Sequence, residues 1–225
     1  TLFESLLTPS PSSVRLNPNK NFHIANTSNI PWTRYGKYLK ERPVYTLDPA
    51  LHAGAYYVQE PSSMFLEQAI IHSIDLKQPL TVLDLCAAPG GKSTHLLSLL
   101  HPDSLLVSNE TIRSRVSILS ENIQKWGYAN ALVTHNDPSY FTSLHGLFDL
   151  IVVDAPCSGL GVVRRKPEIK YKQFGEEMAG LPVKQLAILS ASSQYLKPGG
   201  TLLYSTCTIN PAENEKVVKA FLRQN

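Results

Sequence analysis

The chain has 225 residues, of which 43% are hydrophobic and 17% are charged, a balance typical of a folded domain with a buried core. No apolar run approaches the roughly 18 residues that a membrane-spanning helix needs, so we expect no membrane association. The net charge of +3 is too small to indicate a polyanion partner by itself.

The three cysteines, Cys86, Cys157 and Cys207, are odd in number and far apart, which argues against a disulfide framework. None belongs to a Cys-x-x-Cys pair, and no two histidines lie four residues apart, so we expect no metal site. Reduced thiols are typical of the cytoplasm. We therefore predict a cytoplasmic protein, and we expect a monomer.

Residues 1–48 differ in composition from the rest and are assigned to a small N-terminal lobe. Prolines interrupt this region at positions 9, 11, 18, 31 and 43, with another at position 49. Because prolines at this density break helices, we expect an irregular fold. Basic and aromatic residues lie among the prolines, so the lobe is either a solvated leader or a surface that faces nucleic acid.

From residue 60 onward, segments with helical and strand patterns alternate. Apolar residues predict a helix over residues 64–74, with Pro61 in its first turn. Short apolar runs predict strands at 81–85, 105–109, 131–134, 148–153 and 201–205, and helices are expected at 92–100, 111–126, 183–196 and 212–222. This alternation predicts an α/β domain over residues 49–225, with a mostly parallel sheet covered by helices on both faces.

Ligands bind such sheets at the carboxyl ends of the strands. After the first predicted strand, Gly90 and Gly91 allow a ligand to approach the backbone before the next helix begins. One interpretation is the phosphate-binding loop of an ATPase, because Gly91-Lys92-Ser93 matches the second half of that motif and Asp154 would hold magnesium. The first glycine of the motif is replaced by Cys86, which argues against this alternative.

Two acidic residues follow the second and third predicted strands. Glu110 is placed to accept hydrogen bonds from both ribose hydroxyls of an adenosine-bearing ligand, and Asp137 to accept one from the adenine amino group. Alone, each would be more typical of a helix or turn cap. Together, beside a Gly-Gly loop, they favour an adenosine pocket without a phosphate, which fits S-adenosylmethionine as cofactor.

All three cysteines lie at the predicted ligand edge, and Cys157 and Cys207 follow the fourth and fifth strands. An ionised thiol adds to carbon 6 of a pyrimidine, and carbon 5 then accepts a methyl group from a sulfonium. Asp154 would hydrogen-bond the ring and stabilise the developing charge, and the second thiol would assist release. The pattern alone does not decide which cysteine attacks. The non-enzyme alternative is an RNA-binding scaffold, against which both intact cysteines argue.

At these residues the chain resembles the Nop/Sun (RsmB/RsmF-like) family of S-adenosylmethionine-dependent RNA (cytosine-5)-methyltransferases. The match covers residues 84–92 (DLCAAPGGK), 154–159 (DAPCSG), 206–208 (TCT), 210–215 (NPAENE) and 57–63 (YVQEPSS). The resemblance implies a Rossmann-like methyltransferase domain. It also implies a family cofactor loop made of Cys86, Ala87, Ala88, Pro89, Gly90, Gly91 and Lys92.

The resemblance assigns further roles by position. It implies that Glu110 holds the ribose, that Asp137 holds the adenine, and that Asp154 contacts both cofactor and target base. It makes Cys207 the nucleophile and gives Cys157 the role of aiding release. Family members continue with two more strands, so we expect the sheet to lack its last hairpin, and we expect cofactor binding with weak turnover.

An RNA substrate is expected to meet basic residues near the site. Arg164, Arg165 and Lys166 follow the fourth strand and are predicted to contact phosphates. Arg15, in a family-like stretch of the N-terminal lobe, is predicted to complete the RNA groove. Ribosomal RNA is the expected substrate, and transfer RNA is the alternative.

Overall fold

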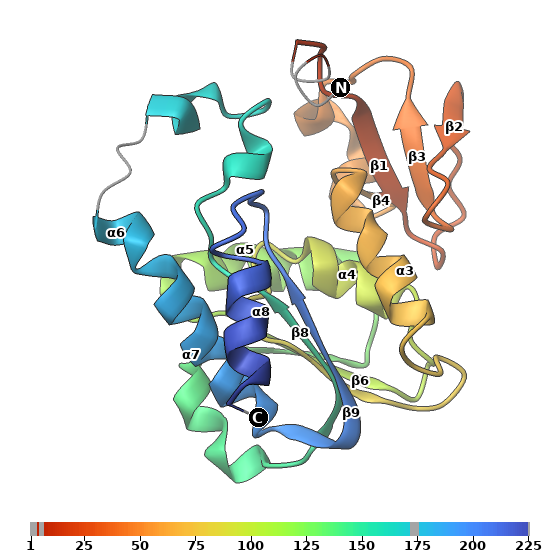
Figure 1. Cartoon of the computed structure of the whole chain (residues 1–225). Helices are drawn as coiled ribbons and strands as arrows, with labels where there is room; N and C mark the ends of the chain where they lie inside the picture. The colour runs from red at the N-terminus through yellow and green to blue at the C-terminus, as the bar shows by residue number, and fades with distance from the viewer. Residues whose placement is uncertain (1–3, 5–6, 172–175, 225) are drawn as a thin grey trace.

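Two β-sheets form the framework of the chain, in a computed structural model that describes residue 4, residues 7–171 and residues 176–224 (Figure 1). The first is an antiparallel sheet with the strand order β2-β3-β1-β4. The second is a parallel sheet with the order β7-β6-β5-β8-β9. The N-terminal sheet lies beyond one end of the parallel sheet and contacts the helices on one of its faces (Figure 1).

The N-terminal sheet corrects the prediction of an irregular lobe. Its strands are β1 (Ser12–Leu16), β2 (Thr27–Asn29), β3 (Gly36–Leu39) and β4 (Tyr56–Val58). The prolines lie before or between these strands, and Pro49 begins the short helix α2 (Pro49–His52), which follows the 3-10 turn η1 (Tyr45–Leu47). Proline therefore sets the strand ends here and does not prevent a sheet. The division of the chain at residues 48 and 49 stays a prediction.

The five predicted parallel strands are confirmed. They are β5 (Thr81–Asp84), β6 (Leu105–Asn109), β7 (Ala131–Thr134), β8 (Phe148–Asp154) and β9 (Leu196–Ser205). Strand β9 begins at Leu196, earlier than predicted, because its pairing with β8 continues through an irregularity between Phe148 and Leu150. The turn-forming residues Pro198 and Gly199 lie inside this irregular stretch.

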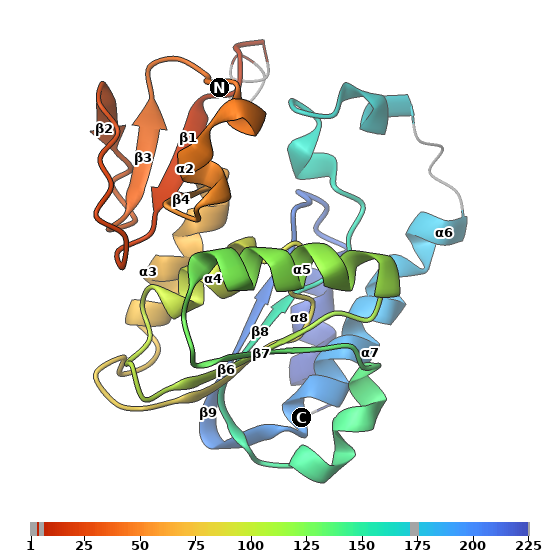
Figure 2. The ribbon, with the colours of Figure 1, turned by 180° about the vertical axis from the view of Figure 1, so that it is seen from behind.

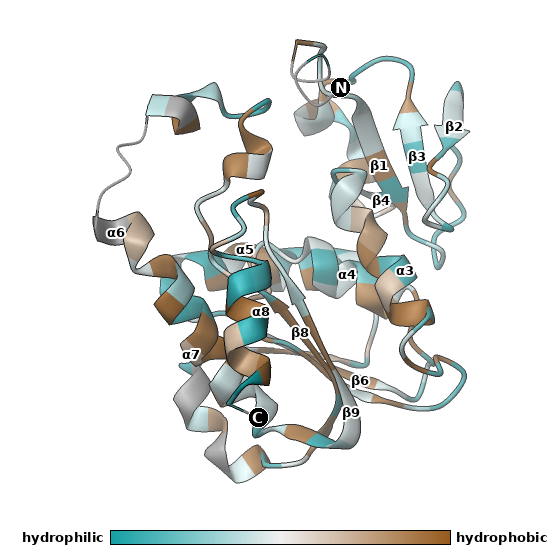
Figure 3. Cartoon of the chain, viewed as in Figure 1, coloured by the Kyte–Doolittle hydropathy of each residue, from teal (hydrophilic) through white to brown (hydrophobic). Residues whose placement is uncertain are grey.

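Helices cover both faces of the parallel sheet, as the alternating pattern predicts (Figure 2). One face packs against α3 (Leu66–Ile71), α4 (Gly91–Leu97) and α5 (Arg113–Trp126), and the other against α7 (Leu181–Ser193) and α8 (Glu215–Leu222). The central strands are apolar throughout, because neighbouring residues such as Val152 and Val153 enter opposite halves of the core (Figure 3). The remaining elements are η2 (Ser62–Phe65), η3 (Pro138–Leu144), η4 (Leu160–Val162), η5 (Pro167–Tyr171) and α6 (Glu176–Ala179).

Two features are absent from the described residues. Within them, no helix has the length and apolar character required to cross a bilayer. Over the same ranges, no group of three His, Cys, Asp or Glu side chains is arranged to hold a metal ion.

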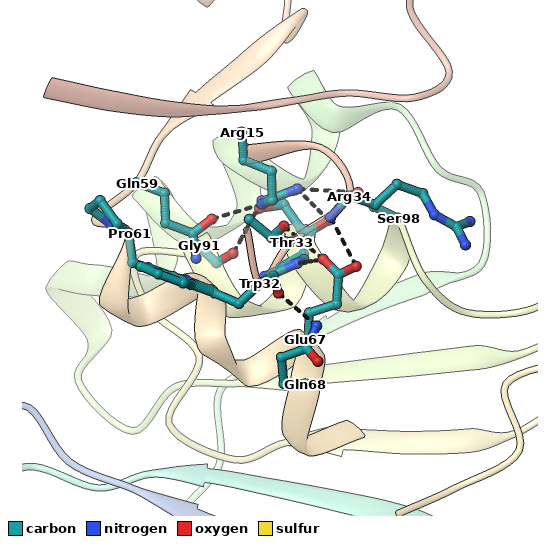
Figure 4. Close-up of polar contacts among 12 residues, drawn as sticks. Arg15, Trp32, Thr33, Arg34, Gln59, Pro61, Glu67, Gln68, Gly91 and Ser98 are labelled. Atoms are coloured by element: carbon teal, nitrogen blue, oxygen red, sulfur yellow. Dashed lines mark hydrogen bonds and ion pairs between the residues drawn. The ribbon is translucent and has the colours of Figure 1, made fainter. Parts of the chain in front are cut away.

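A buried carboxylate, Glu67 of α3, joins the N-terminal sheet to the helical layer (Figure 4). It accepts hydrogen bonds from the Thr33 hydroxyl at 2.7 Å and the Arg34 backbone N–H at 3.0 Å, and it lies 3.0 Å from Nε2 of His95. Burial lowers the pKa of His95 to about 4, so its ring is neutral near pH 7 and donates to Glu67. The buried Nδ1 of His95 has no partner among the described residues, so a protonated ring would bury an unpaired N–H.

We predict that the protein loses stability as pH falls from about 7 toward about 4. The His95 side chain takes up its proton near pH 6.5 in the unfolded chain but only near pH 4 in the folded one, so protons favour unfolding across this window. Protonation of Glu67 also favours unfolding, at lower pH, because its pKa is lowered in the folded chain. Burial raises its pKa, but hydrogen bonds from His95, Thr33 and Arg34 outweigh burial and lower it.

The matched variant is His95→Gln, whose amide can donate to Glu67 and does not titrate. We expect its melting temperature to fall less steeply than that of the parent chain between pH 7 and pH 5, as followed by calorimetry. Equal slopes in the two proteins would show that His95 does not control the acid sensitivity.

Candidate active site

A cavity of about 560 Å³ opens at the carboxyl ends of the parallel strands. Seven residues singled out from the sequence line it, namely Cys86, Ala88, Glu110, Asp137, Asp154, Cys157 and Cys207. Ala155 and Pro156 belong to the 154–159 motif, and the remaining lining residues were not singled out from the sequence: Thr111, Ile112, Arg115, Lys184, Ala187, Ile188 and Ala191. Strand order therefore predicts the inner wall of the cavity, and the side chains of α5 and α7 complete it.

The Gly-Gly loop (residues 86–92) connects β5 to α4 and presents only Cys86 and Ala88 to the cavity. The Ala87 N–H donates to the Asn109 carbonyl at 2.8 Å, which holds the loop against the end of β6. Gly90 adopts a left-handed φ of 108° just before α4 begins, a conformation that side chains with a Cβ disfavour. Ala87, Pro89, Gly90 and Gly91 are not cavity-lining residues, so they shape the loop from behind.

Glu110 lies directly after β6, and its side chain is only 3% exposed. Its Oε1 accepts a hydrogen bond from the Ile112 backbone N–H at 2.9 Å. Its buried Oε2 lies 3.2 Å from Nη1 of Arg115 but has no hydrogen-bond partner in the described structure. A buried carboxylate oxygen in this state is suited to accept a hydrogen bond from a ligand. Asp137 is exposed and lines the same cavity.

Asp154, the last residue of β8, pairs with the last residue of the Gly-Gly loop. The Lys92 ammonium lies 2.6 Å from Asp154 Oδ2, and the Ser205 hydroxyl donates to Oδ1 at 2.9 Å. The sequence predicts a site role for both Lys92 and Asp154 but does not predict this ion pair. The pair places a fixed positive and a fixed negative charge beside the cysteines.

The thiols of Cys157 and Cys207 lie 3.0 Å apart, although 50 positions separate them in the sequence. They are neighbours because β8 and β9 run parallel and their last residues, Asp154 and Ser205, lie opposite each other. The third cysteine differs. Burial, together with the negative charge of Asp84, raises the pKa of Cys86 to about 12, so Cys86 remains a neutral thiol.

Glu213 connects the loop that contains Cys157 to the loop that contains Cys207, a role that the sequence pattern does not reveal. Its buried carboxylate accepts hydrogen bonds from the Ser158 N–H at 2.9 Å and the Gln185 amide at 3.1 Å, and from Asn210 at 3.1 Å. Burial raises the pKa of Glu213, but these donors outweigh it and lower the pKa overall. In the sequence, Glu213 is marked only by its place in the 210–215 motif.

Gly161 brings a further segment against the same loops. Its N–H donates to the Cys207 carbonyl at 2.9 Å, and a Cβ at this position would lie 2.7 Å from that carbonyl oxygen. The hydroxyls of Ser158 and Thr208 also meet, at 2.8 Å. Together these contacts hold the two thiols in one geometry.

A hydrogen bond joins the two thiols and shifts their pKa values in opposite directions. A hydrogen bond from Cys157 lowers the pKa of Cys207 to about 7, and nearby Lys92 acts in the same direction against burial and Asp154. The pKa of Cys157 is raised by the same hydrogen bond and by burial. The Cys207 N–H donates to Cys157 Sγ at 3.2 Å, which favours the opposite assignment. Because Cys207 is the more exposed of the two, we assign it the negative charge.

The basic residues predicted to face RNA fall into two groups. Arg15 is buried, and its donors are taken up by acceptors inside the protein, so the prediction that it contacts RNA is corrected. Arg164, Arg165 and Lys166 lie in the segment after β8, and the latter two are exposed. Arg164 donates to the Pro9 carbonyl at 2.9 Å, and Arg165 lies 3.3 Å from Glu60. This segment is thereby joined to the N-terminal region.

Two family models match the sequence. The model described as 16S rRNA methyltransferase RsmB/F matches residues 71–225. The model described as the N-terminal domain of 16S rRNA methyltransferase RsmF matches residues 1–61.

Curated relatives carry the same description. The ribosomal RNA small subunit methyltransferase F of Pectobacterium atrosepticum is 38% identical over 195 residues, which cover 84% of this chain and 40% of that protein. Its counterpart in Shewanella woodyi is 40% identical over 165 residues, which cover 73% of this chain and 34% of that protein. The chain thus spans about 40% of the length of such relatives.

Solved structures confirm the predicted Rossmann-like methyltransferase fold. A methyltransferase homolog protein from Pyrococcus horikoshii superposes with a TM-score of 0.79 at 29% identity and covers 98% of this chain and 72% of that one. NSun6 from the same organism, solved with SFG, gives a TM-score of 0.71 at 30% identity and covers 81% of this chain and 46% of that one.

The assigned ionisation predicts that Cys207 is the reactive thiol. We expect iodoacetamide to alkylate Cys207 with a rate that is half-maximal near pH 7, whereas Cys86 remains unmodified below about pH 9. In Cys157→Ala, loss of the donated hydrogen bond moves the midpoint for Cys207 to higher pH. Peptide mass spectrometry after timed quenching measures each rate. Faster labelling of Cys157 than of Cys207 in the parent chain would reverse the assignment.

Proposed function

Because the chain belongs to the family of 16S rRNA methyltransferases RsmB/F, we propose that it transfers a methyl group from S-adenosylmethionine to carbon 5 of a cytosine in small-subunit ribosomal RNA. The observation that supports this chemistry is the pair of thiols 3.0 Å apart beside the Lys92–Asp154 ion pair. Transfer RNA is the alternative substrate. We retain the cytoplasm as the predicted location and a monomer as the predicted state.

The cavity suits a nucleoside ligand. Oε2 of Glu110, which makes an ion pair with Arg115 but has no hydrogen-bond partner in the described structure, is an acceptor for a ribose hydroxyl, and exposed Asp137 is an acceptor for the adenine amino group. Cys86 and Ala88 would contact the ligand along the Gly-Gly loop. Asp154 and Glu110 place carboxylate oxygens at the cavity edge, each beside a cation, Lys92 and Arg115 respectively. When bound, S-adenosylmethionine supplies an electrophilic methyl group.

An ATPase is disfavoured by the same loop. Cys86 stands where the phosphate-binding loop requires glycine. A binding scaffold without catalysis would have no use for a thiol whose pKa is lowered to about 7.

In the proposed reaction, Cys207 acts as the nucleophile. Its thiolate forms a bond to carbon 6 of the cytosine, and the electron pair of the ring double bond becomes available at carbon 5, which takes the methyl group. Asp154 and Lys92 lie beside the thiols, where they can hydrogen-bond the ring and stabilise its changing charge. Solvent takes up the carbon 5 proton, whose loss restores the ring double bond, and the bond from carbon 6 to sulfur breaks with its electron pair returning to Cys207.

Cys157 is proposed to assist this last step. As the neutral partner in the thiol pair, it stabilises the Cys207 thiolate before attack and again as Cys207 leaves. A less stable thiolate is a poorer leaving group, so removing Cys157 shifts the balance toward the covalent adduct.

We predict that Cys157→Ala, mixed with S-adenosylmethionine and a transcript of small-subunit ribosomal RNA, accumulates a covalent protein–RNA adduct. A denaturing gel reveals the adduct as a shifted protein band. Because trapping requires only a single round of attack, the experiment does not depend on turnover.

The controls fix the roles of the two cysteines. Cys207→Ala and the double variant should give no shifted band. An adduct that forms without Cys207 but requires Cys157 would contradict the assignment. A band that forms with transfer RNA but not with the ribosomal transcript would select the alternative substrate.

The exposed cations after β8 are proposed to contact phosphates of the RNA. We expect Lys166→Gln to weaken RNA binding and to reduce the slope of log K against log salt by about 1, the change due to one lost phosphate contact. Fluorescence anisotropy between 50 and about 300 mM salt measures the slope. Lys77→Gln, on the loop before β5, is the matched control and should leave the slope unchanged. An unaltered slope for Lys166→Gln would exclude this residue from the RNA interface.

A further inference from the structure

Arg15 projects from β1 of the N-terminal sheet into a fully buried position against α4 (Figure 4). A guanidinium carries five N–H donors. Here each has an acceptor: Nε bonds Gln59 Oε1 at 2.7 Å, Nη1 bonds the Thr94 carbonyl at 3.2 Å and Ser98 Oγ at 3.1 Å, and Nη2 bonds the Gly91 carbonyl at 3.2 Å and Thr94 Oγ1 at 2.6 Å. The group is thus held in a single orientation.

The Arg15 guanidinium lies 4.5 Å from the centre of the Trp126 ring, which offsets part of the cost of burying a cation. None of the hydrogen-bond acceptors of Arg15 is a carboxylate. Removing an ion from water is expensive, and an apolar residue of similar volume often fills such a site at no loss of stability. Burial lowers the pKa of Arg15 to about 9, so the group still carries its charge near pH 7. We infer that the rigid arrangement of the five N–H donors fixes the conformation of the residues that accept hydrogen bonds from Arg15.

The atoms that Arg15 binds belong to the turn between the Gly-Gly loop and α4. The Thr94 hydroxyl accepts from Arg15 and donates in turn to the Gly90 carbonyl at 2.7 Å. Gly90 is the residue with the left-handed φ, and Gly91 binds Arg15 directly. Arg15 thus holds the loop from behind, while Cys86 and Ala88 on its front line the cavity.

A second side chain of the same segment makes a useful contrast. Asn17 is also buried, and its amide donates to the carbonyls of Gly54 and Trp126, each at 2.9 Å. It therefore joins the N-terminal region to the end of α5 without contacting the Gly-Gly loop. Of these two buried side chains, Arg15 contacts the Gly-Gly loop and Asn17 does not.

We propose that Arg15 is a positioning residue for the methyl-donor site, holding the Gly-Gly loop through Thr94 in the conformation that receives the donor. In this proposal the N-terminal sheet contributes to binding of the methyl donor. The identity of the donor rests on the proposed function, whereas the role of Arg15 in shaping the loop does not.

The test compares donor affinity with loop protection in four variants of the chain. By titration calorimetry with S-adenosylmethionine and S-adenosylhomocysteine, we expect Arg15→Met and Thr94→Val each to raise Kd by about tenfold, within the usual range of coupling between sites. In the double variant, the loss of binding free energy should be smaller than the sum of the losses in the two single variants, because both substitutions remove the same connection. Asn17→Ala should lower the melting temperature but change Kd by less than about twofold.

Hydrogen exchange without any ligand gives an independent measure. Arg15→Met should speed exchange of the amides of residues 87–94, and Asn17→Ala should speed exchange near residues 54 and 126 instead. If Arg15→Met does not fold, Thr94→Val decides the question by both measurements.

The outcomes separate the two proposals. Unchanged Kd and unchanged loop exchange in Thr94→Val and Arg15→Met would overturn the role of Arg15, as would an equal rise of Kd in Asn17→Ala. A parent chain that binds neither ligand would contradict the proposed donor, and the exchange data would then still decide whether Arg15 holds the loop.

Discussion

The parallel pairing of β8 with β9 is the constraint on which the candidate site depends. Its register sets Asp154 opposite Ser205, so the loops that follow leave the sheet side by side and their thiols come to 3.0 Å. β5, the other neighbour of β8, delivers Lys92 to the same point through the Gly-Gly loop. A covalent mechanism needs a nucleophile, a proton partner and fixed charges within one small region. Three adjacent strand ends supply all of these before any ligand arrives.

Buried polar contacts make the surrounding layers part of that site. Glu213 joins the loops of the two cysteines, and Glu67 joins the N-terminal sheet to α3 and α4. Arg15 extends the second connection to the turn at Gly90. Hydrogen bonds of this kind are directional, so they specify a geometry that apolar packing leaves free. The N-terminal sheet and the parallel sheet therefore act on one cavity, although each has its own strands.

The sequence predicted those features that follow from local patterns. Apolar runs identified all five parallel strands, and their order placed Cys86, Glu110, Asp154 and Cys207 at one edge. The N-terminal sheet was missed because strands of three to five residues between prolines carry little periodicity. Contacts between distant segments have no local signal: the Lys92–Asp154 pair and the clamp at Glu213 depend on how strands pair. Arg15 was misread for the same reason, since a basic residue in a polar segment is indistinguishable by pattern from one that faces RNA.

The central claim is that Cys207 forms the covalent bond to the target cytosine. Ribosomal RNA containing 5-fluorocytidine tests it directly, because fluorine at carbon 5 cannot leave as a proton does and the adduct of the unaltered protein is trapped after methyl transfer. Nuclease and protease digestion followed by tandem mass spectrometry locates the modified residue. We expect a methylated fluoropyrimidine nucleotide on the peptide that contains Cys207. A nucleotide attached to the peptide with Cys157 would contradict it.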